Sequence, residues 1–433
     1  MRFWIIAGLA VCAAAQGLDQ KTQLLARIKA HMSDELSRLP NYTCLETTNR
    51  FYRDVAAAGH NPKPLQPLDI VRLEVIYTDH HEWYGEPGSR SLAEDDPASF
   101  IGSGMIGNGM FGITLHNIFL TDAAMFTPHG EETVKGRAAL RYDFRLPRLQ
   151  RGLEISLQAA NGTVGEAGSF WVDPKSLDLI RLQSHADEIP EFLPLAALNL
   201  DVDYARTRVG GGDALLPQQA GLNLEKSGGD QEYNRIAFTH CRAYSAESSV
   251  RFDDAPPAAA ITVNAKPGAP AVRAPEALPA LLAVTIQLTT PVSDRDTVGS
   301  LIEGRVVGDV KRRGAVAIPD GSRVHGRIRR LESFPSKEQF IAGLEFTEVE
   351  VNGIPMRFYA DLLSLDRSKT IRAILTDSSL VAHGDKATIS NETITLPELP
   401  GVASFFVAGK AFTLPAGFKT VWRTRGLIRG TPY

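Results

Sequence analysis

The sequence lacks the features that usually identify an enzyme or a nucleic-acid-binding protein. It contains no Gly-x-Ser-x-Gly elbow, no His-Glu-x-x-His helix and no phosphate-binding loop. The formal net charge is −4, without the basic surplus of a general nucleic-acid binder. After residue 15 no apolar run is long enough to span a bilayer. We therefore expect no enzyme, no catalytic, cofactor-binding or metal-binding residues, no nucleic-acid partner and no transmembrane span in the mature chain.

The N-terminus has the composition of a secretory signal peptide. Arg2 precedes an apolar segment at 3–11, and three alanines follow at 13–15. We expect residues 1–15 to be a signal peptide and the mature protein to be periplasmic or secreted, with association to the outer membrane as a further option. The alternative is a lipoprotein signal with lipidation at Cys12, although Val11 before it is branched.

Cysteine is scarce, with only three in the chain. Removal of the signal peptide would leave Cys44 and Cys241, an even pair in an oxidising compartment. The sequence therefore predicts a disulfide between them. A reactive thiol is the alternative, but neither cysteine lies in a Cys-x-x-Cys pair or a nucleophile motif.

The remaining pattern is that of a mainly β protein with one N-terminal helix. Apolar residues at 25, 28, 32 and 36 share one face of a predicted helix from 18 to 39. Short alternating segments separated by tight turns follow, without helical patterns between them. We expect residues 17–254 to form a curved antiparallel sheet, or half-barrel, packed on the helix.

A change in composition marks a second domain. Residues 255–280 hold six prolines and ten alanines, which predicts an extended linker. The segment 281–433 is again rich in strand patterns, and we expect a small β-barrel or sandwich there. Within it, 315–331 has the pattern of a hairpin around Pro319-Asp320-Gly321, and Asn352-Gly353 marks a second hairpin.

Two resemblances follow from these segments. The helix face at 25–36 and the strand–turn–strand segment 168–182 make the first half similar to LolA/LolB-like periplasmic lipoprotein carriers, which implies an incomplete barrel that holds an acyl chain. The segments 304–310 and 316–326 resemble the β-barrel domain of TrbI-like proteins of conjugation and type IV secretion. This chain has neither the membrane-spanning segment nor the amphipathic helix pair of that family, so the resemblance does not imply a channel.

A glycine-rich loop supplies the first candidate site. Residues 102–107 match the dinucleotide fingerprint G-x-G-x-x-G, but they follow Glu94-Asp95-Asp96-Pro97 and no strand, which favours a loop. Methionine and phenylalanine side chains alternate with glycines up to residue 112. We expect this loop to roof a hydrophobic groove against the helix face, or to be tucked onto the sheet. The groove residues would be Leu25, Ile28, Met32, Leu36, Met110 and Phe111.

A row of arginines supplies the second candidate site. Arg323, Arg327 and Arg329 fall on one face of a predicted strand. A solvated barrel face is the plain interpretation. The functional one is a contact surface for anionic envelope polymers or lipid headgroups.

Together these patterns favour a non-enzymatic protein of the bacterial envelope. Its first domain would bind a hydrophobic or lipid ligand, and its second would dock to an envelope partner. One alternative is a structural module of a secretion or surface assembly without a small ligand. Another is an extracytoplasmic hydrolase.

Overall fold

The structure is a computed structural model that describes residues 6–54, 64–78, 81–89, 96–157, 160–244, 278–366, 371–375, 399 and 401–426. Its contacts divide the chain into two compact units. The first comprises Met1–Leu65, Glu74–Tyr84 and Met105–Ser248, and the second comprises Gln66–Leu73, Gly85–Gly104 and Ser249–Tyr433. Two early segments therefore group with the second unit. Most of the expected linker 255–280 lies outside the described residues, and its linking role stays a prediction.

The first unit contains the N-terminal helix and most of an antiparallel sheet. Its helical elements are α1 (Ile6–Ser37), α2 (Ile113–Leu115), η2 (His116–Leu120) and α3 (Arg148–Arg151). The short helix η1 (Pro97–Phe100) belongs to the second unit. The strands are β1 (Tyr42–Arg53), β2 (Gln66–Thr78), β3 (His81–Gly85), β4 (Met125–Val134), β5 (Arg137–Leu146), β6 (Leu153–Leu157), β7 (Ala160–Val172), β8 (Leu179–Asp187), β9 (Leu195–Val209), β10 (Gly212–Lys226) and β11 (Gln231–Ala243). The boundary between the units runs through β2.

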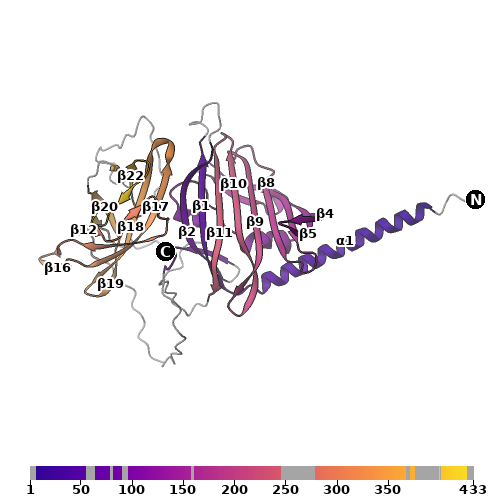
Figure 1. Cartoon of the computed structure of the whole chain (residues 1–433), viewed down its shortest axis with the longest axis horizontal. Helices are drawn as coiled ribbons and strands as arrows, with labels where there is room; N and C mark the ends of the chain where they lie inside the picture. Colours follow the sequence, from indigo (N-terminus) through magenta and orange to yellow (C-terminus); the bar gives the residue numbers. More distant parts are fainter. Residues whose placement is uncertain are drawn as a thin grey trace, which may run out of the picture. The chain divides into compact units, whose positions relative to one another are not determined.

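These strands follow the order β3-β2-β1-β11-β10-β9-β8-β7-β5-β4, with β6 paired to β7 (Figure 1). Strands β7 to β11 are sequential neighbours, as short turns between alternating segments predict. The expected fold class, a curved antiparallel half-barrel with few helices, is confirmed. The helix begins earlier than expected and ends at Ser37, three residues before Pro40. Among the described residues, no helix combines the length and apolarity needed to cross a membrane.

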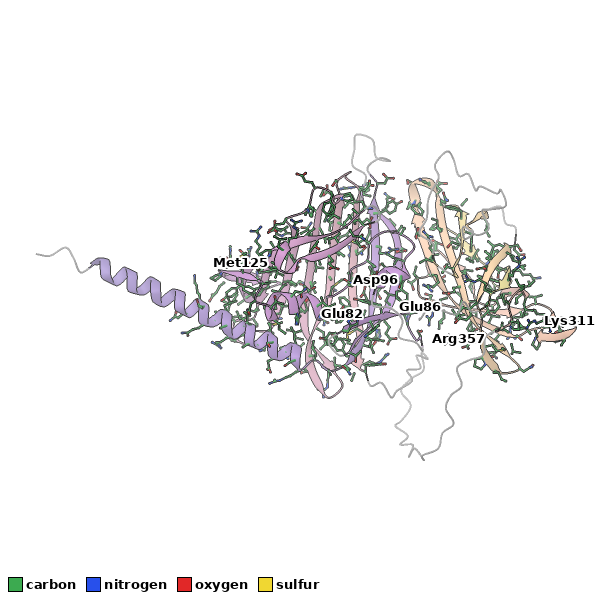
Figure 2. All side chains as sticks on the ribbon, turned by 180° about the vertical axis from the view of Figure 1, so that it is seen from behind. Glu82, Glu86, Asp96, Met125, Lys311 and Arg357 are labelled. Carbon is green, nitrogen blue, oxygen red and sulfur yellow. A yellow bond between two sulfur atoms is a disulfide. The ribbon has the colours of Figure 1, made fainter. Side chains whose placement is uncertain are left out.

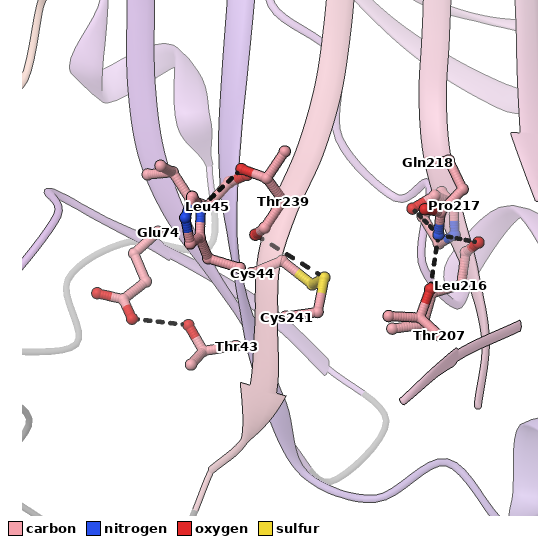
Figure 3. The surroundings of a disulfide bond; sticks show 11 residues. Thr43, Cys44, Leu45, Glu74, Thr207, Leu216, Pro217, Gln218, Thr239 and Cys241 are labelled. Atoms are coloured by element: carbon pink, nitrogen blue, oxygen red, sulfur yellow. Dashed lines mark hydrogen bonds between the residues drawn. A yellow bond between two sulfur atoms is a disulfide. The ribbon is translucent and has the colours of Figure 1, made fainter. Parts of the chain in front are cut away.

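The predicted disulfide between Cys44 and Cys241 is confirmed, with Cα atoms 4.1 Å apart (Figure 3). The two cysteines lie on strands β1 and β11, which are adjacent inside the sheet, whose edge strands are β3 and β4. The bridge lies at a bulge, because the register shifts between the pairs Thr43↔Arg242 and Leu45↔Thr239.

The second unit is built on a further antiparallel sheet. The remaining elements are β12 (Ala283–Leu288), β13 (Val292–Ser293), β14 (Leu301–Val306), β15 (Val310–Arg312), β16 (Ala315–Ile318), β17 (Arg323–Phe334), η3 (Pro335–Lys337), β18 (Gln339–Val351), β19 (Ile354–Arg357), β20 (Ala360–Leu365), β21 (Ile371–Leu375), β22 (Ala403–Ala408), β23 (Thr413–Leu414) and β24 (Lys419–Thr424). The main sheet has the order β20-β24-β12-β14-β17-β18-β22-β21, with β19 paired to β18.

The two hairpins expected in this unit have different outcomes. The Asn352-Gly353 hairpin is confirmed, since both residues have positive φ, 52° and 78°, and β18 pairs with β19. The expected hairpin at 315–331 is wrong. Strand β16 pairs with β15, whereas β17 pairs with β14 and β18. The Pro319-Asp320-Gly321 turn therefore carries the chain from one sheet to another.

Candidate functional site

The inner face of the first unit's sheet is covered by a segment that we call the plug, residues 105–120. It includes α2 and η2 and overlaps most of the glycine-rich loop. Five of its apolar side chains are at most 3% exposed, namely Met110, Phe111, Leu115, Ile118 and Phe119, whereas Ile113 and Leu120 are exposed. These five side chains lie inside the unit, as expected for a loop that is tucked onto the sheet, and a ligand groove beneath the loop stays a prediction.

A single buried carboxylate holds the plug backbone. Glu82 of β3 is 2% exposed and accepts hydrogen bonds from the backbone N–H groups of Gly109 (3.0 Å), Phe111 (3.1 Å) and Gly112 (3.0 Å). The Tyr84 hydroxyl donates a fourth hydrogen bond at 2.9 Å. Figure 2 labels Glu82 within the sheet. Hydrogen bonds to a charged acceptor are stronger than neutral ones, so this cluster fixes the plug backbone at one point.

Two of the plug glycines are required by this geometry. Gly109 has a φ of +80°, which favours glycine. A Cβ at Gly112 would lie 2.7 Å from the Tyr77 ring. Gly112 thus allows close packing of the plug against β2.

Aromatic side chains place the plug across the inner face of the sheet. The Phe111 ring lies 5.7 Å from Tyr42 on β1 and 4.7 Å from Phe238 on β11. The Phe119 ring lies 4.9 Å from Phe170 on β7. Because β1 and β7 are separated by β11, β10, β9 and β8 in the sheet order, the plug spans most of the sheet.

Two further hydrogen bonds attach the start of the plug. The Tyr204 hydroxyl donates to the Met110 carbonyl at 3.2 Å, and the Asn234 side-chain amide donates to the Met105 carbonyl at 2.8 Å. Both donors come from central strands, β9 and β11. The plug is therefore bound by a few polar contacts, while its side chains form an apolar layer.

Buried ionisable groups surround the plug contacts. Burial raises the pKa of Glu82, and the hydrogen bonds from Gly112, Tyr84, Phe111 and Gly109 oppose this increase. Burial also raises the pKa of Glu46 to about 7, although Thr48 donates a hydrogen bond to its carboxylate at 2.8 Å. The interior is thus apolar with an acidic cluster near β1 and β3.

The C-terminal half of α1 packs against this layer through η2. Ile28, Met32 and Leu36 are buried at 0%, 1% and 6% exposure, and Leu25 is half-buried. With Met110 and Phe111, five of the six expected groove residues are buried. That they contact a ligand stays a prediction.

An ion network fixes the same half of α1 to the sheet. Arg206 of β9 donates to Glu35 at 2.9 Å and to Asp178 at 2.6 Å, and His31 contacts Asp178 at 3.0 Å. Burial would raise the pKa of Asp178, but hydrogen bonds from Arg206 and His31 lower it. The ligand atoms of His31, Glu35 and Asp178 are close enough for a metal ion. The Arg206 guanidinium already neutralises these carboxylates, so we interpret the cluster as an ion network that attaches α1 to the sheet.

The outer face of the same sheet carries an open groove of about 780 Å³. Its floor includes Arg141, Asp143 and Ser169, which alternate with inward residues such as Tyr142 and Phe170. The Asp143 carboxylate accepts hydrogen bonds from Arg141 at 2.9 Å and from Ser169 at 2.7 Å. Much of the charge on this floor is therefore internally paired.

In the second unit, two of the three arginines expected to face an anionic surface are engaged internally. Arg327 is 8% exposed, and its Nε lies 2.9 Å from Glu86. Arg329 contacts the same carboxylate at 3.3 Å and also pairs with Glu345. Only Arg323 is exposed. The expected row is thus not a common free surface, because Glu86 from the early segment 85–104 neutralises two of its members.

Backbone pairing ties the other early segment to the same unit. The Arg72 N–H donates to the Val298 carbonyl at 3.0 Å, and the Val298 N–H donates to the Ile70 carbonyl at 2.9 Å. In addition, a Cβ at Gly102 would lie 2.3 Å from the Arg330 side chain, so the segment 85–104 also approaches the buried Arg330–Glu332 pair closely. These contacts explain why the second unit includes residues that precede the linker by almost two hundred positions.

The comparisons with known proteins found similarity only to solved structures. No protein-family model matches the chain, and no curated protein sequence matches it. A domain from Vibrio parahaemolyticus described as outer membrane lipoprotein-sorting protein is similar at 11% identity and a TM-score of 0.31, over 51% of this chain and 93% of that one. A DUF1329 family protein from Desulfovibrio piger is similar at 13% identity and a TM-score of 0.27, over 54% and 97%. These values are too low to transfer a function. The TrbI-like resemblance stays a prediction.

The sequence did not reveal the residues that hold the plug. Glu82 lies in His81-Glu82-Trp83-Tyr84-Gly85, where alternation alone does not distinguish an inward carboxylate from an outward one. Glu46 and Asn234 are equally inconspicuous. The one available signal was the excess of Met and Phe in a glycine-rich loop, which indicated burial but not the partner.

Proposed function

We propose that the first unit binds a long acyl chain on the inner face of its sheet, in the space that the plug occupies in this conformation. The observation that carries the proposal is that one buried carboxylate, Glu82, accepts three backbone hydrogen bonds from the plug, whose other printed bonds to the sheet come from Tyr204 and Asn234. A plug fixed at few polar points can leave as a unit when those contacts open. In this proposal the protein is a non-enzymatic component of the envelope, periplasmic or secreted, and the second unit holds it at an envelope surface.

An energy comparison supports a long ligand. Exposing five buried apolar side chains costs about 10 kcal/mol, at about 2 kcal/mol each. An acyl chain of about 14 methylene groups gains about 11 kcal/mol on burial. The free energy of replacing the plug with the ligand is therefore close to zero for a long acyl chain and unfavourable for a short one. The proposal thus predicts selectivity for chain length.

The test uses a variant that loosens the plug without removing its side chains. In Glu82→Gln one carboxylate oxygen becomes an NH₂ group, which cannot accept the hydrogen bonds that Gly109 and Tyr84 now donate to Oε2. A loss of about 2 kcal/mol in the free energy that holds the plug raises the fraction of molecules with the plug released about 30-fold. The apparent affinity for the ligand rises by the same factor. We expect the variant to bind a fluorescent long-chain fatty acid more tightly than the wild type, with palmitate displacing the probe and octanoate failing to do so.

The matched control is Glu154→Gln, the same change at an exposed position in the first unit. It should leave probe binding unchanged. If Glu82→Gln lowers the stability of the first unit but neither protein binds the probe, the plug is a permanent part of the core. The structural-module alternative would then be the better interpretation.

A further inference from the structure

The short hairpin β15–β16 stands apart from the main sheet of the second unit. Its two strands pair only with each other among the described strands, and the label of β16 lies at the edge of the unit in Figure 1. The turn residues Arg313 and Gly314 have φ values of 50° and 87°, as in a tight two-residue hairpin turn. Buried Val310 and Ile318 anchor its base. The hairpin is therefore a short, well-anchored projection.

Five exposed basic residues gather on this hairpin and the adjacent strand ends. Lys311, Arg312 and Arg313 lie on the hairpin, and Arg305 and Arg323 are directly opposite each other in the β14–β17 register. Within the described part of the chain, none of the five has an ion pair or a side-chain hydrogen bond. Like charges in direct cross-strand positions are unfavourable, so nothing in the unit's own packing explains this arrangement.

The neighbouring carboxylates accept hydrogen bonds from backbone N–H groups. Asp309 accepts a hydrogen bond from the Asp320 N–H at 3.0 Å, and Asp320 accepts one from the Gly308 N–H at 2.7 Å. They brace the base of the hairpin without pairing with its cations. Residues 305–323 hold five basic and two acidic side chains in a chain of net charge −4. The hairpin is thus a local positive site on an acidic protein.

Aliphatic side chains accompany this charge. Val307 is 37% exposed and Val316 is 48% exposed. A soluble polyanion would satisfy the cations but would leave these valines in water. The interface of an anionic bilayer satisfies both, because phosphate groups lie next to the acyl boundary.

We propose that the β15–β16 hairpin, together with Arg305 and Arg323, docks on an anionic lipid surface, with Val307 and Val316 entering the headgroup region. The proposal names the surface at which the second unit acts in the proposed function, and it does not depend on acyl-chain binding by the first unit. Figure 2 labels Lys311 at the exposed end of this site.

The experiment is co-sedimentation of the full chain with vesicles of phosphatidylcholine alone or mixed with phosphatidylglycerol. We expect binding only to the anionic vesicles, and weaker binding as ionic strength rises. The triple variant Lys311→Gln, Arg312→Gln and Arg313→Gln should bind about 100-fold more weakly, because each basic residue near the surface contributes about a fivefold factor.

The matched control carries the same loss of charge at other exposed basic positions, Lys175→Gln, Arg208→Gln and Arg295→Gln. It should bind anionic vesicles within a few-fold of the wild type. A second variant, Val307→Ser with Val316→Ser, should bind several-fold more weakly at unchanged charge. Circular dichroism establishes that each variant is folded.

Three results would overturn the proposal. They are equal binding to neutral vesicles, equal losses in the hairpin triple variant and the control, and absence of vesicle binding by a wild-type chain that instead binds soluble polyphosphate. None of them bears on fatty-acid binding by the first unit, so this proposal can fail while the ligand proposal stands.

Discussion

Glu46 offers a test of the buried acidic cluster that is independent of any ligand. Its side chain is 2% exposed on the inner face of β1, and the Thr48 hydroxyl donates to it at 2.8 Å. Burial raises its pKa to about 7, with a smaller contribution from the nearby charge of Glu82. In the change Glu46→Gln the shape and the acceptor oxygen are retained, while the charge is removed.

The sign of the effect follows from proton linkage. The folded state keeps a proton on Glu46 up to pH about 7, whereas the unfolded chain releases it near the ordinary glutamate pKa of 4.5. Between these values the folded state binds more protons, so stability falls as pH rises. The difference between the two pKa values corresponds to about 3 kcal/mol of stability that is present below pH 4.5 and lost by about pH 7.

Glu46→Gln removes this loss, because glutamine does not ionise. At the acidic end of the range, variant and wild type should have nearly equal free energies of unfolding. Above the folded-state pKa the variant should be more stable by about 3 kcal/mol. The assay is urea unfolding of the full chain, followed by tryptophan fluorescence at several pH values between these limits. The measured quantity is the difference between the two proteins, in which the other titrating groups largely cancel.

A variant that is less stable than the wild type by the same amount at every pH would refute this reasoning. It would mean that Glu46 has the same pKa in the folded and unfolded states, and that its shape or hydrogen bonding determines its contribution. Glu154→Gln is again the control, since an exposed carboxylate should give a difference near zero across the range.

Two further predictions concern covalent and domain structure. Replacing Cys44 and Cys241 together by serine should lower the free energy of unfolding by up to about 5 kcal/mol, the chain-entropy value for a separation of 197 residues, and reduction of the wild type should mimic the variant in urea unfolding. The fragment 281–433 should melt at a lower temperature than the same unit in the full chain, because losing Glu86 leaves Arg327 and Arg329 partly buried without that partner, at about 3–5 kcal/mol. Identical melting by calorimetry would show that the early segments are dispensable.

The sequence by itself determined the fold class, because periodicity is a local property. Alternation with a period of two, tight turns and one amphipathic helix are sufficient for an antiparallel sheet with a helix on one face. The disulfide also followed from the sequence, because the expected removal of the signal peptide would leave Cys44 and Cys241 as an even pair. The sequence also indicated the burial of Met110 and Phe111, because Met and Phe are unusually frequent for a glycine-rich loop.

Only the tertiary structure shows which residues, distant in the sequence, contact each other. Glu82 binds the plug across almost thirty positions, and Glu86 neutralises Arg327 and Arg329 across more than two hundred. A strand pattern states which side chains share a face, but not whether that face meets solvent, a ligand or another segment of the chain. For the same reason the sequence did not show that Arg327 and Arg329 pair with Glu86, or that Met110 and Phe111 are buried. Burial of a charged or apolar group depends on distant residues that come near it only when the chain folds.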